Sequence, residues 1–215
     1  ALFYSGGLQW PMFGIAALGL AGVLLLQQLG VRRAWAYVPA GAVLWWGGGW
    51  LWQQPLMDRP RRLWQITRMD PPTALPVPVE GVAARRIADT WGAARDGGAR
   101  GHEGVDIFAP RGTPVRSSTV GIVTAVRDGG LGGRQVWVLG PARERHYYAH
   151  LDDWAPGLQT GDVVQPGTLL GFVGTTGNAQ GTPPHLHYGI YGADGALNPW
   201  PLLRAGAQGA GSRKP

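Results

Sequence analysis

The stretch "GTPPHLHYGIYG", residues 181–192, places His185 and His187 one residue apart, directly after a double proline. Side chains two positions apart in a β-strand point to the same face of the sheet and lie about 6–7 Å from each other. Leu186 then points to the opposite face, toward the core. Two neighbouring imidazoles on one face have two interpretations: an accident of the surface, or a metal ligand beside a catalytic residue.

Short runs of β-forming character precede this stretch. They are rich in β-branched and aromatic residues, and Gly, Pro and Asp separate them; examples are "GIVTAV", "RQVWVLG", "HYYAHL" and "LLGFVG". Such spacing predicts an antiparallel sheet rather than a parallel α/β fold. The predicted fold class is therefore mainly β, with a compact antiparallel β-sheet domain over residues 79–203 and a disordered tail over residues 204–215.

All five histidines lie in this β region, and His102 precedes Asp106 by four positions in "GHEGVDIFAP". On a straight strand the pair would be about 13 Å apart, too far to share an ion. A turn at Gly104 would bring the two side chains together, because glycine adopts backbone angles that other residues avoid. With His187 as a third ligand, the set matches a catalytic zinc site, which leaves its fourth position to water. The chain has no cysteine, which excludes a thiolate metal site and a disulfide framework.

Four stretches carry a resemblance to a known family. In chain order they are "GHEGVDIFAPRGTPV", "YYAHLD", "GDVVQPGTLLGFVGTTGN" and "PHLHYGIY". They resemble the lysostaphin/LytM-type zinc metallopeptidases, which cleave peptidoglycan. The resemblance covers residues 79–203 and implies a domain of the duplicated-hybrid-motif type, with its site in a groove across one face. It also implies that His102, Asp106 and His187 bind zinc, and that His150 and His185 form the catalytic pair.

A neutral histidine beside a zinc-bound water can accept its proton, because an unperturbed imidazole pKa of about 6.5 suits that role. The sequence leaves open which of His150 and His185 is the general base. Candidates for the substrate groove are Tyr148, Tyr188 and His146. Two departures from the family pattern affect the groove rim and remove no ligand. They are the double proline before the H-L-H motif and a Tyr-Gly pair where Phe-Glu is common.

The first 55 residues differ from the rest in composition. Residues 10–29 contain no charged side chain, and about 20 helical positions span about 30 Å, the thickness of a bilayer core. A second uncharged run covers residues 34–52, after an Arg pair. We expect a membrane anchor of one or two transmembrane helices over residues 1–55, with a cleaved signal peptide as the alternative for the first run. Residues 56–78 are predicted to be a basic juxtamembrane and proline-rich linker.

The net charge of +6 does not indicate nucleic-acid binding. Six Arg and two Asp precede residue 71, whereas residues 79–203 contain ten Arg and eleven acidic residues. The β region is therefore close to neutral and carries no recognisable nucleic-acid module. The excess positive charge lies beside the apolar segment and at the tail, so lipid of the cytoplasmic membrane is the expected partner there.

The sequence predicts a membrane-anchored zinc endopeptidase that hydrolyses peptide cross-links of peptidoglycan, with D,D-endopeptidase as the expected specificity. Its substrate, the peptidoglycan peptide stem, lies outside the cytoplasmic membrane, so the catalytic domain is expected to face the periplasm or outer side. Four Arg between residues 59 and 68 favour the opposite orientation. The alternative is a non-catalytic member of the fold that binds the wall or activates other hydrolases, which the complete ligand set disfavours. A sugar-transport phosphocarrier of similar β architecture is a third hypothesis, which the H-x-x-x-D pair disfavours.

Overall fold

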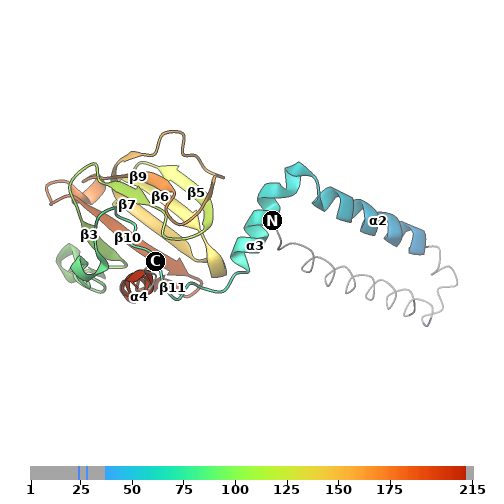
Figure 1. The fold of residues 1–215 in the computed structure, drawn as a ribbon, viewed down its shortest axis with the longest axis horizontal. Helices are drawn as coiled ribbons and strands as arrows, with labels where there is room; N and C mark the ends of the chain where they lie inside the picture. The colour runs from blue at the N-terminus through green and yellow to red at the C-terminus, as the bar shows by residue number, and fades with distance from the viewer. Residues whose placement is uncertain (1–23, 25–27, 29–36, 212–215) are drawn as a thin grey trace. The chain divides into compact units, whose positions relative to one another are not determined.

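The computed structural model describes residues 24, 28 and 37–211 of the chain (Figure 1). The chain divides into two units, residues 1–58 and 59–215. The second unit contains the strands and is called the β domain.

The first unit contains α2 (Tyr37–Trp52), which forms part of the second predicted apolar run, and the short helix η2 (Pro55–Met57). The first apolar run, predicted over residues 10–29, lies outside the described residues apart from Leu24 and Gln28. Among the helices of the described residues, none combines the length and the apolar character needed to span a membrane.

The β domain is built of short strands joined by turns. Its strands are β1 (Ala94–Arg95), β2 (Arg100–Gly101), β3 (Val105–Phe108), β4 (Pro114–Arg116), β5 (Gly121–Arg127), β6 (Arg134–Leu139), β7 (Arg145–Trp154), β8 (Val163–Val164), β9 (Leu169–Val173), β10 (His185–Gly192) and β11 (Gly195–Leu197). Its helical segments are α3 (Asp58–Thr67, which begins one residue before the unit), η3 (Ala84–Arg86), η4 (Asp96–Gly98), η5 (Pro141–Arg143), η6 (Gly177–Ala179) and α4 (Trp200–Gly211).

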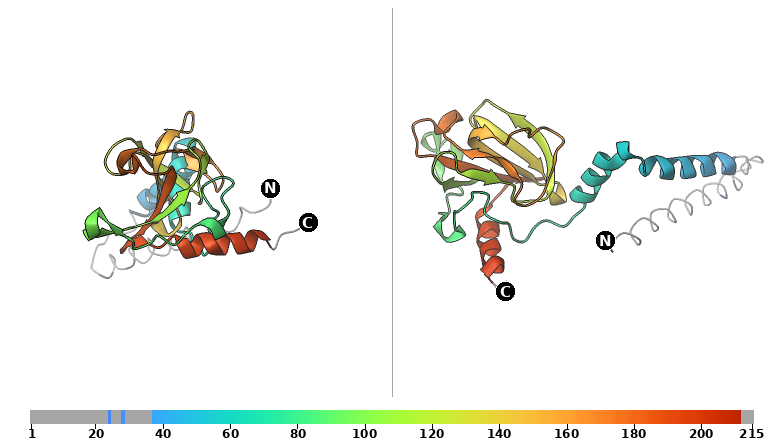
Figure 2. Two further views of the ribbon diagram at one scale, coloured as in Figure 1. Left: turned by 90° about the vertical axis from the view of Figure 1, so that its left-hand side faces the viewer. Right: turned by 45° about the horizontal axis from the view of Figure 1, so that its top comes forward.

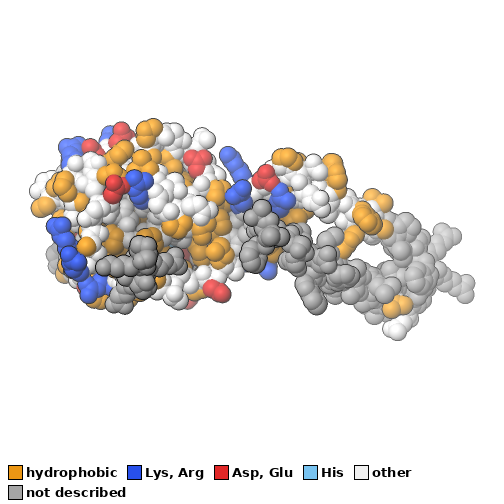
Figure 3. Space-filling model, in the orientation of Figure 1, with side chains coloured by type: hydrophobic (Ala, Val, Ile, Leu, Met, Phe, Trp, Pro, Cys, Tyr) orange, Lys and Arg blue, Asp and Glu red, His pale blue; other side chains and the backbone are white. Residues whose placement is uncertain are grey.

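One nine-stranded antiparallel sheet dominates the β domain. Its central order is β11-β10-β7-β6-β5-β8, while β3 pairs with β10, and β9 pairs with both β4 and β7. Strands β1 and β2 form a separate two-stranded ribbon. The prediction of a mainly β, antiparallel domain is confirmed. Figure 3 shows basic and acidic side chains together on the visible face of this domain, as its balanced charge leads one to expect.

Alternate side chains of β10 point to the core face of the sheet and to the opposite face. Leu186, Tyr188 and Ile190 are fully buried and belong to the main apolar cluster. His185 and His187 alternate with them and therefore point to the other face. Because a slip of one residue would exchange the two faces, burial of the apolar set fixes the register that positions both histidines.

The structure differs from the prediction of a disordered tail over residues 204–215. Helix α4 continues to Gly211, and the last four residues lie outside the described part of the chain. The Trp200 N–H donates to Asn198 Oδ1 over 2.9 Å at the start of the helix, and Leu203 is fully buried. Gly206 lies against the Leu75 backbone so closely that a Cβ would not fit. Figure 2 shows α4 on the outside of the β domain.

The structure also differs from the prediction of a linker over residues 56–78. Its first part forms α3, and its proline-rich part packs onto the β domain instead of bridging freely. The Leu75 N–H donates to Leu202 O over 3.0 Å, and Met69 O accepts from the Ala142 N–H over 3.0 Å. Leu75 is 2% exposed, so apolar burial holds a segment whose prolines already favour an extended backbone.

Candidate active site

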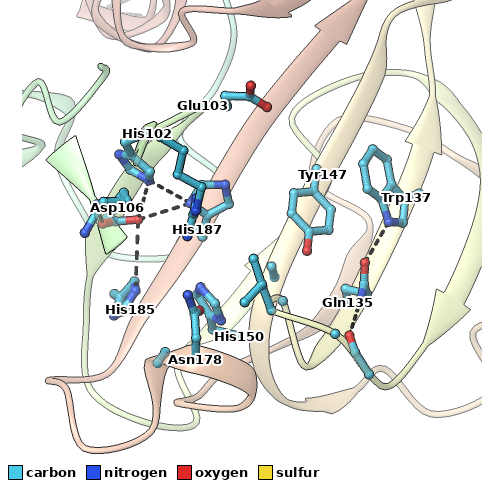
Figure 4. A pocket seen from close by; sticks show the side chains of 18 of the residues that line it. His102, Glu103, Asp106, Gln135, Trp137, Tyr147, His150, Asn178, His185 and His187 are labelled. Atoms are coloured by element: carbon cyan, nitrogen blue, oxygen red, sulfur yellow. Dashed lines mark hydrogen bonds and ion pairs between the residues drawn. The ribbon is translucent and has the colours of Figure 1, made fainter. Parts of the chain in front are cut away.

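The structure brings His102, Asp106 and His187 together where β3 meets β10 (Figure 4). Asp106 lies directly opposite His187 in the register of the two strands. His102 Nε2 is 3.1 Å from Asp106 Oδ1 and 2.8 Å from His187 Nδ1, and the latter two atoms are 3.2 Å apart. Tetrahedral zinc ligands, about 2.0–2.1 Å from the ion, are separated by about 3.3 Å. The three atoms therefore form a donor set that fits zinc.

Gly104 is required at this site for space, not for a turn. Its backbone is not in the left-handed region that the predicted turn would have used. A Cβ at this position would lie 2.6 Å from Tyr188 O and 2.7 Å from His187 Cε1. Only glycine therefore lets the segment between His102 and Asp106 pass close to the ring of His187.

Three site histidines hydrogen-bond a backbone carbonyl through Nδ1: His102 to Thr90 (2.7 Å), His150 to Thr176 (2.9 Å) and His185 to Pro183 (2.8 Å). Because a carbonyl can only accept, each Nδ1 carries the hydrogen and each Nε2 presents a lone pair. This tautomer suits His102 as a metal ligand. It leaves Nε2 of the other two able to accept a proton, and that of His185 is 4.0 Å from Asp106 Oδ1.

A bulge in β7 turns His150 toward the groove. On a regular strand His150 would share a face with His146, four positions earlier. Instead, β7 places two residues, Ala149 and His150, opposite the single residue Gln135 of β6. His150 has φ 62°, in the left-handed region, and its N–H donates to Gly132 O over 2.9 Å. The extra residue places His150 on the face opposite to that of His146.

The ring of His150 lies beside the proposed metal ligands. Its centroid is 5.1 Å from that of His185 and 5.9 Å from that of His187, both in edge-on geometry. The five residues named by the sequence thus converge on one site from β3, β7, β10 and the segment before β3.

The structure does not place the three predicted groove residues, Tyr148, Tyr188 and His146, in the groove. All three are fully buried on the core face. Tyr148 and Tyr188 are register partners across β7 and β10, and His146 Nδ1 hydrogen-bonds Tyr188 Oη over 2.8 Å. The physical reason is strand alternation. Tyr188 follows His187 and points to the opposite face, and its register partner Tyr148 shares that core face. His146 shares it too, as the register partner of the buried Ile190.

A groove of about 820 Å³ lies beside His102, Asp106 and His187, the three candidate metal ligands, which are called the metal cluster below. Its aromatic wall consists of Trp137, Tyr147 and Tyr191, with the first two rings stacked at 4.2 Å between centroids. The Trp137 Nε1–H donates to Gln135 Oε1 over 2.9 Å (Figure 4). The sequence motifs did not indicate this wall. One signal was available, because Tyr191 follows His187 by four positions and a period of two predicts the same face.

Arg95 is a further site residue that the sequence analysis did not identify. Its Nη2 atom is 2.5 Å from Asp106 Oδ2, while Oδ1 of the same carboxylate faces the histidines. Arg95 comes from β1, so no local motif links it to Asp106. The guanidinium holds one oxygen of the carboxylate and leaves the other to the metal cluster.

Burial and hydrogen bonds set the charges of the site. Burial raises the pKa of the Asp106 carboxyl, but the interactions of this carboxyl with the adjacent His102 and His187 side chains outweigh burial and hold this pKa well below its usual range. Burial lowers the pKa of His187, and burial with the nearby charge of His187 lowers the pKa of His150 to about 4. At neutral pH the Asp106 carboxyl is therefore ionised and the imidazoles of His187 and His150 are neutral, which are the states that metal ligands and a general base require.

Comparison with known proteins identifies relatives of the β domain. Peptidase family M23 matches residues 100–199, which contain all five converging residues. The L-Ala–D-Glu endopeptidase of Bacillus subtilis (strain 168) is 42% identical over 142 residues, or 61% of this chain and 43% of the relative. The DD-carboxypeptidase/endopeptidase Mpg of Neisseria meningitidis serogroup B (strain MC58) is 40% identical over 108 residues, or 50% of this chain and 22% of the relative.

Solved structures agree. LytM from Ruminococcus gnavus ATCC 29149 is 33% identical with a TM-score of 0.52, and the match covers 79% of this chain and 73% of that one. A zinc-containing peptidase from Vibrio cholerae is 26% identical with a TM-score of 0.50, and covers 58% of this chain and 38% of that one. The fold and the site together are those of a metallopeptidase domain of the lysostaphin/LytM type. The chain belongs to peptidase family M23.

The N-terminal segment has different relatives. Residues 1–48 match the Na+/H+ antiporter 1 family. The Na+/H+ antiporter NhaA of Acidovorax sp. (strain JS42) is 92% identical over 53 residues, which are 25% of this chain and 12% of the antiporter. The chain spans less than half the length of each of these three curated relatives.

Proposed function

We propose that the chain is a zinc-dependent endopeptidase that hydrolyses the stem peptides of peptidoglycan. The observation that carries this proposal is the convergence of His102, Asp106 and His187 with His150 and His185 beside one open groove. Two relatives with names that include endopeptidase support it.

The residues of the chain divide the work of peptide hydrolysis. His102, Asp106 and His187 hold the metal, and Arg95 holds the second oxygen of the carboxylate. A zinc ion held by these residues would lower the pKa of a bound water toward about 7 and would polarise the scissile carbonyl. Nε2 of His150 or His185 accepts the proton of the attacking water, and the proton passes to the leaving amine as the C–N bond breaks.

The bond that is cut is a finer part of the proposal. The sequence favours a D,D cross-link, and the Neisseria relative has a name of that kind. The L-Ala–D-Glu bond is a second candidate because the match to the Bacillus relative is longer. Mass analysis of the fragments released from intact peptidoglycan distinguishes the two, since only the second cut separates L-Ala from the rest of the stem.

The N-terminal segment supports a membrane-anchored form of the enzyme. Its similarity is to a short part of a membrane antiporter, so we propose contact with the bilayer and not ion transport. We place the β domain outside the cytoplasmic membrane, where peptidoglycan lies. A reporter fused after residue 211 and active only in the cytoplasm would contradict this orientation.

The decisive experiment uses the full chain, purified in detergent and loaded with zinc. We expect about one zinc per chain and release of soluble fragments from peptidoglycan sacculi. Asp106→Asn should lose both, whereas the matched control Asp152→Asn, which pairs with Arg111 outside the groove, should lose neither. If the zinc-loaded chain binds sacculi but releases no fragments, the non-catalytic alternative is correct.

A further inference from the structure

A second hollow continues the groove at the end away from the metal cluster. It has a volume of about 210 Å³ and is lined by Thr124, Ala125, Arg127, Trp137 and Arg145. Arg127 and Trp137 also line the main groove, so the two spaces are neighbours. The proposed catalytic chemistry gives these residues no role.

The two arginines of this hollow have no acidic partner. Among the described residues, no carboxylate lies within 4.0 Å of Arg127 or Arg145. Arg95 and Arg134, which also lie near the groove, are each paired with an aspartate. The side chains of Arg127 and Arg145 are exposed, and the Cζ atom of Arg145 lies 5.7 Å from the centre of the Trp137 ring. Their charges are therefore available to a ligand.

The floor between the arginines is held in place. Gln135 is 5% exposed; it accepts the Trp137 indole N–H, and its own Nε2 donates to Gly129 O over 2.9 Å. The other side of Trp137 stacks on Tyr147. The indole at the floor of the hollow is therefore held in place by a hydrogen bond at its edge and by a stacked ring on one face.

A line of aromatic contacts connects this hollow to the metal cluster. The ring centroid of Tyr147 lies 5.7 Å from that of His187 and 4.2 Å from that of Trp137. Figure 4 shows the three side chains in this sequence across the groove. An extended peptide advances about 3.3 Å per residue, so a peptide cut at the metal cluster would reach the arginines a few residues from the scissile bond.

We propose that Arg127 and Arg145, above Trp137, form a subsite for a free carboxylate of the peptide substrate. Guanidinium groups bind carboxylates through paired, charge-assisted hydrogen bonds, and the aromatic floor supports the apolar part of the same residue. The subsite deepens the proposed function, on which it rests, by selecting acidic peptides. A glutamate linked through its side chain presents such a carboxylate, and amidation of that group removes the charge.

The test uses two synthetic stem peptides that differ at one group, the α-carboxylate of the side-chain-linked glutamate or its carboxamide. For the zinc-loaded full chain, kcat/KM should be about tenfold or more higher for the acid than for the amide. Arg127→Gln and Arg145→Gln should each reduce this ratio, mainly through the KM of the acidic peptide, and the double variant should bring it close to one. Arg116 lies on β4 and is paired with Glu80, so Arg116→Gln is the matched control and should keep the wild-type ratio.

Equilibrium binding of the same labelled peptides separates this proposal from the proposed function. If neither peptide is cleaved but the acid binds about tenfold more tightly and loses this preference in the double variant, the subsite stands and the proposed hydrolysis fails. If the wild-type chain binds and cleaves both peptides equally, or if the double variant weakens both alike, the carboxylate subsite is wrong.

Discussion

Strand β7 contains two histidines with opposite surroundings. His146 is fully buried against Tyr188, whereas His150, four residues later, faces the groove beside the metal cluster. Regular alternation would give both the same face. The single extra residue of the β7 bulge makes the difference, so residue type alone does not assign a histidine to the site.

The same contrast holds for the two faces of β10. His185 and His187 face the groove, while Leu186 and Tyr188 pack in the core. Substitutions on the groove face should change metal binding or catalysis, and substitutions on the core face should change stability. The predictions below test this division between the two faces.

The largest contrast is expected between His187 and His146. His187→Ala removes a proposed metal ligand, so we expect zinc to be lost and hydrolysis of sacculi to fall by at least about 10³-fold. His146→Ala should keep zinc and activity but lose about 1–3 kcal/mol of unfolding free energy, because it removes a hydrogen-bond partner of the buried Tyr188 hydroxyl. Metal analysis, fragment release and urea unfolding of both variants provide the measurements. Loss of zinc in both would show that the two faces are not independent.

The next contrast lies within the groove face. His150→Gln and His185→Gln should keep zinc, because neither side chain belongs to the three-residue cluster. Each should lower kcat by about 10²–10⁴-fold through loss of a proton acceptor. Steady-state kinetics at matched zinc content measures the effect, and the residue with the larger loss at high pH is the better candidate for the general base. Loss of zinc in either variant would move that histidine into the metal shell.

The sequence predicts the chemistry of the site better than its walls. A metal site needs particular residue types at fixed spacing, so His102, Asp106 and His187 were identifiable from their motifs, and the structure brings them together. The bulge at His150 depends on pairing with Gln135, which is distant in sequence, and period-two alternation could not show it. The catalytic and ligand roles remain predictions.

Two other errors have tertiary causes. Residues 204–211 are rich in glycine and alanine, yet Leu203 anchors their helix in the core. Likewise, Leu75 joins that core from within a proline-rich stretch whose composition is typical of a linker. Composition describes the isolated segment, and burial against the domain decides its structure.

The pH dependence of stability is the third test, and it concerns the core face. Burial lowers the pKa of His146 from 6.5 to about 4. His146 binds a proton at about pH 6.5 in the unfolded chain and at about pH 4 in the folded chain. The stability that the neutral His146 contributes to the folded state is therefore fully present above pH 6.5 and is lost as the pH falls toward 4. The loss is on the order of 3 kcal/mol. Urea unfolding at pH 7 and 4.5, with metal chelated, should show a smaller pH dependence for His146→Gln than for the wild type.

Other groups act in both proteins and serve as an internal control. His150 has a pKa of about 4 and contributes in the same direction, while burial raises the pKa of Glu144, which acts in the opposite direction. Neither group is altered by His146→Gln, so the difference between the two proteins isolates residue 146. Equal pH dependence in both would mean that His146 is solvated or protonated in the folded chain.

The smallest expected effect is at Gly104, where the two faces meet. A Cβ there would contact both the Tyr188 carbonyl, on the core-facing residue, and the ring of His187. Because the backbone cannot retreat without disturbing the β3–β10 pairing, Gly104→Ala should displace His187 and weaken zinc binding by about 10–100-fold. Gly101→Ala is the matched control, since its Cβ would find its nearest neighbour at 3.9 Å. Competition with a metal chelator measures both affinities; if Gly104→Ala binds zinc like Gly101→Ala, then the close approach at Gly104 does not hold His187 in place.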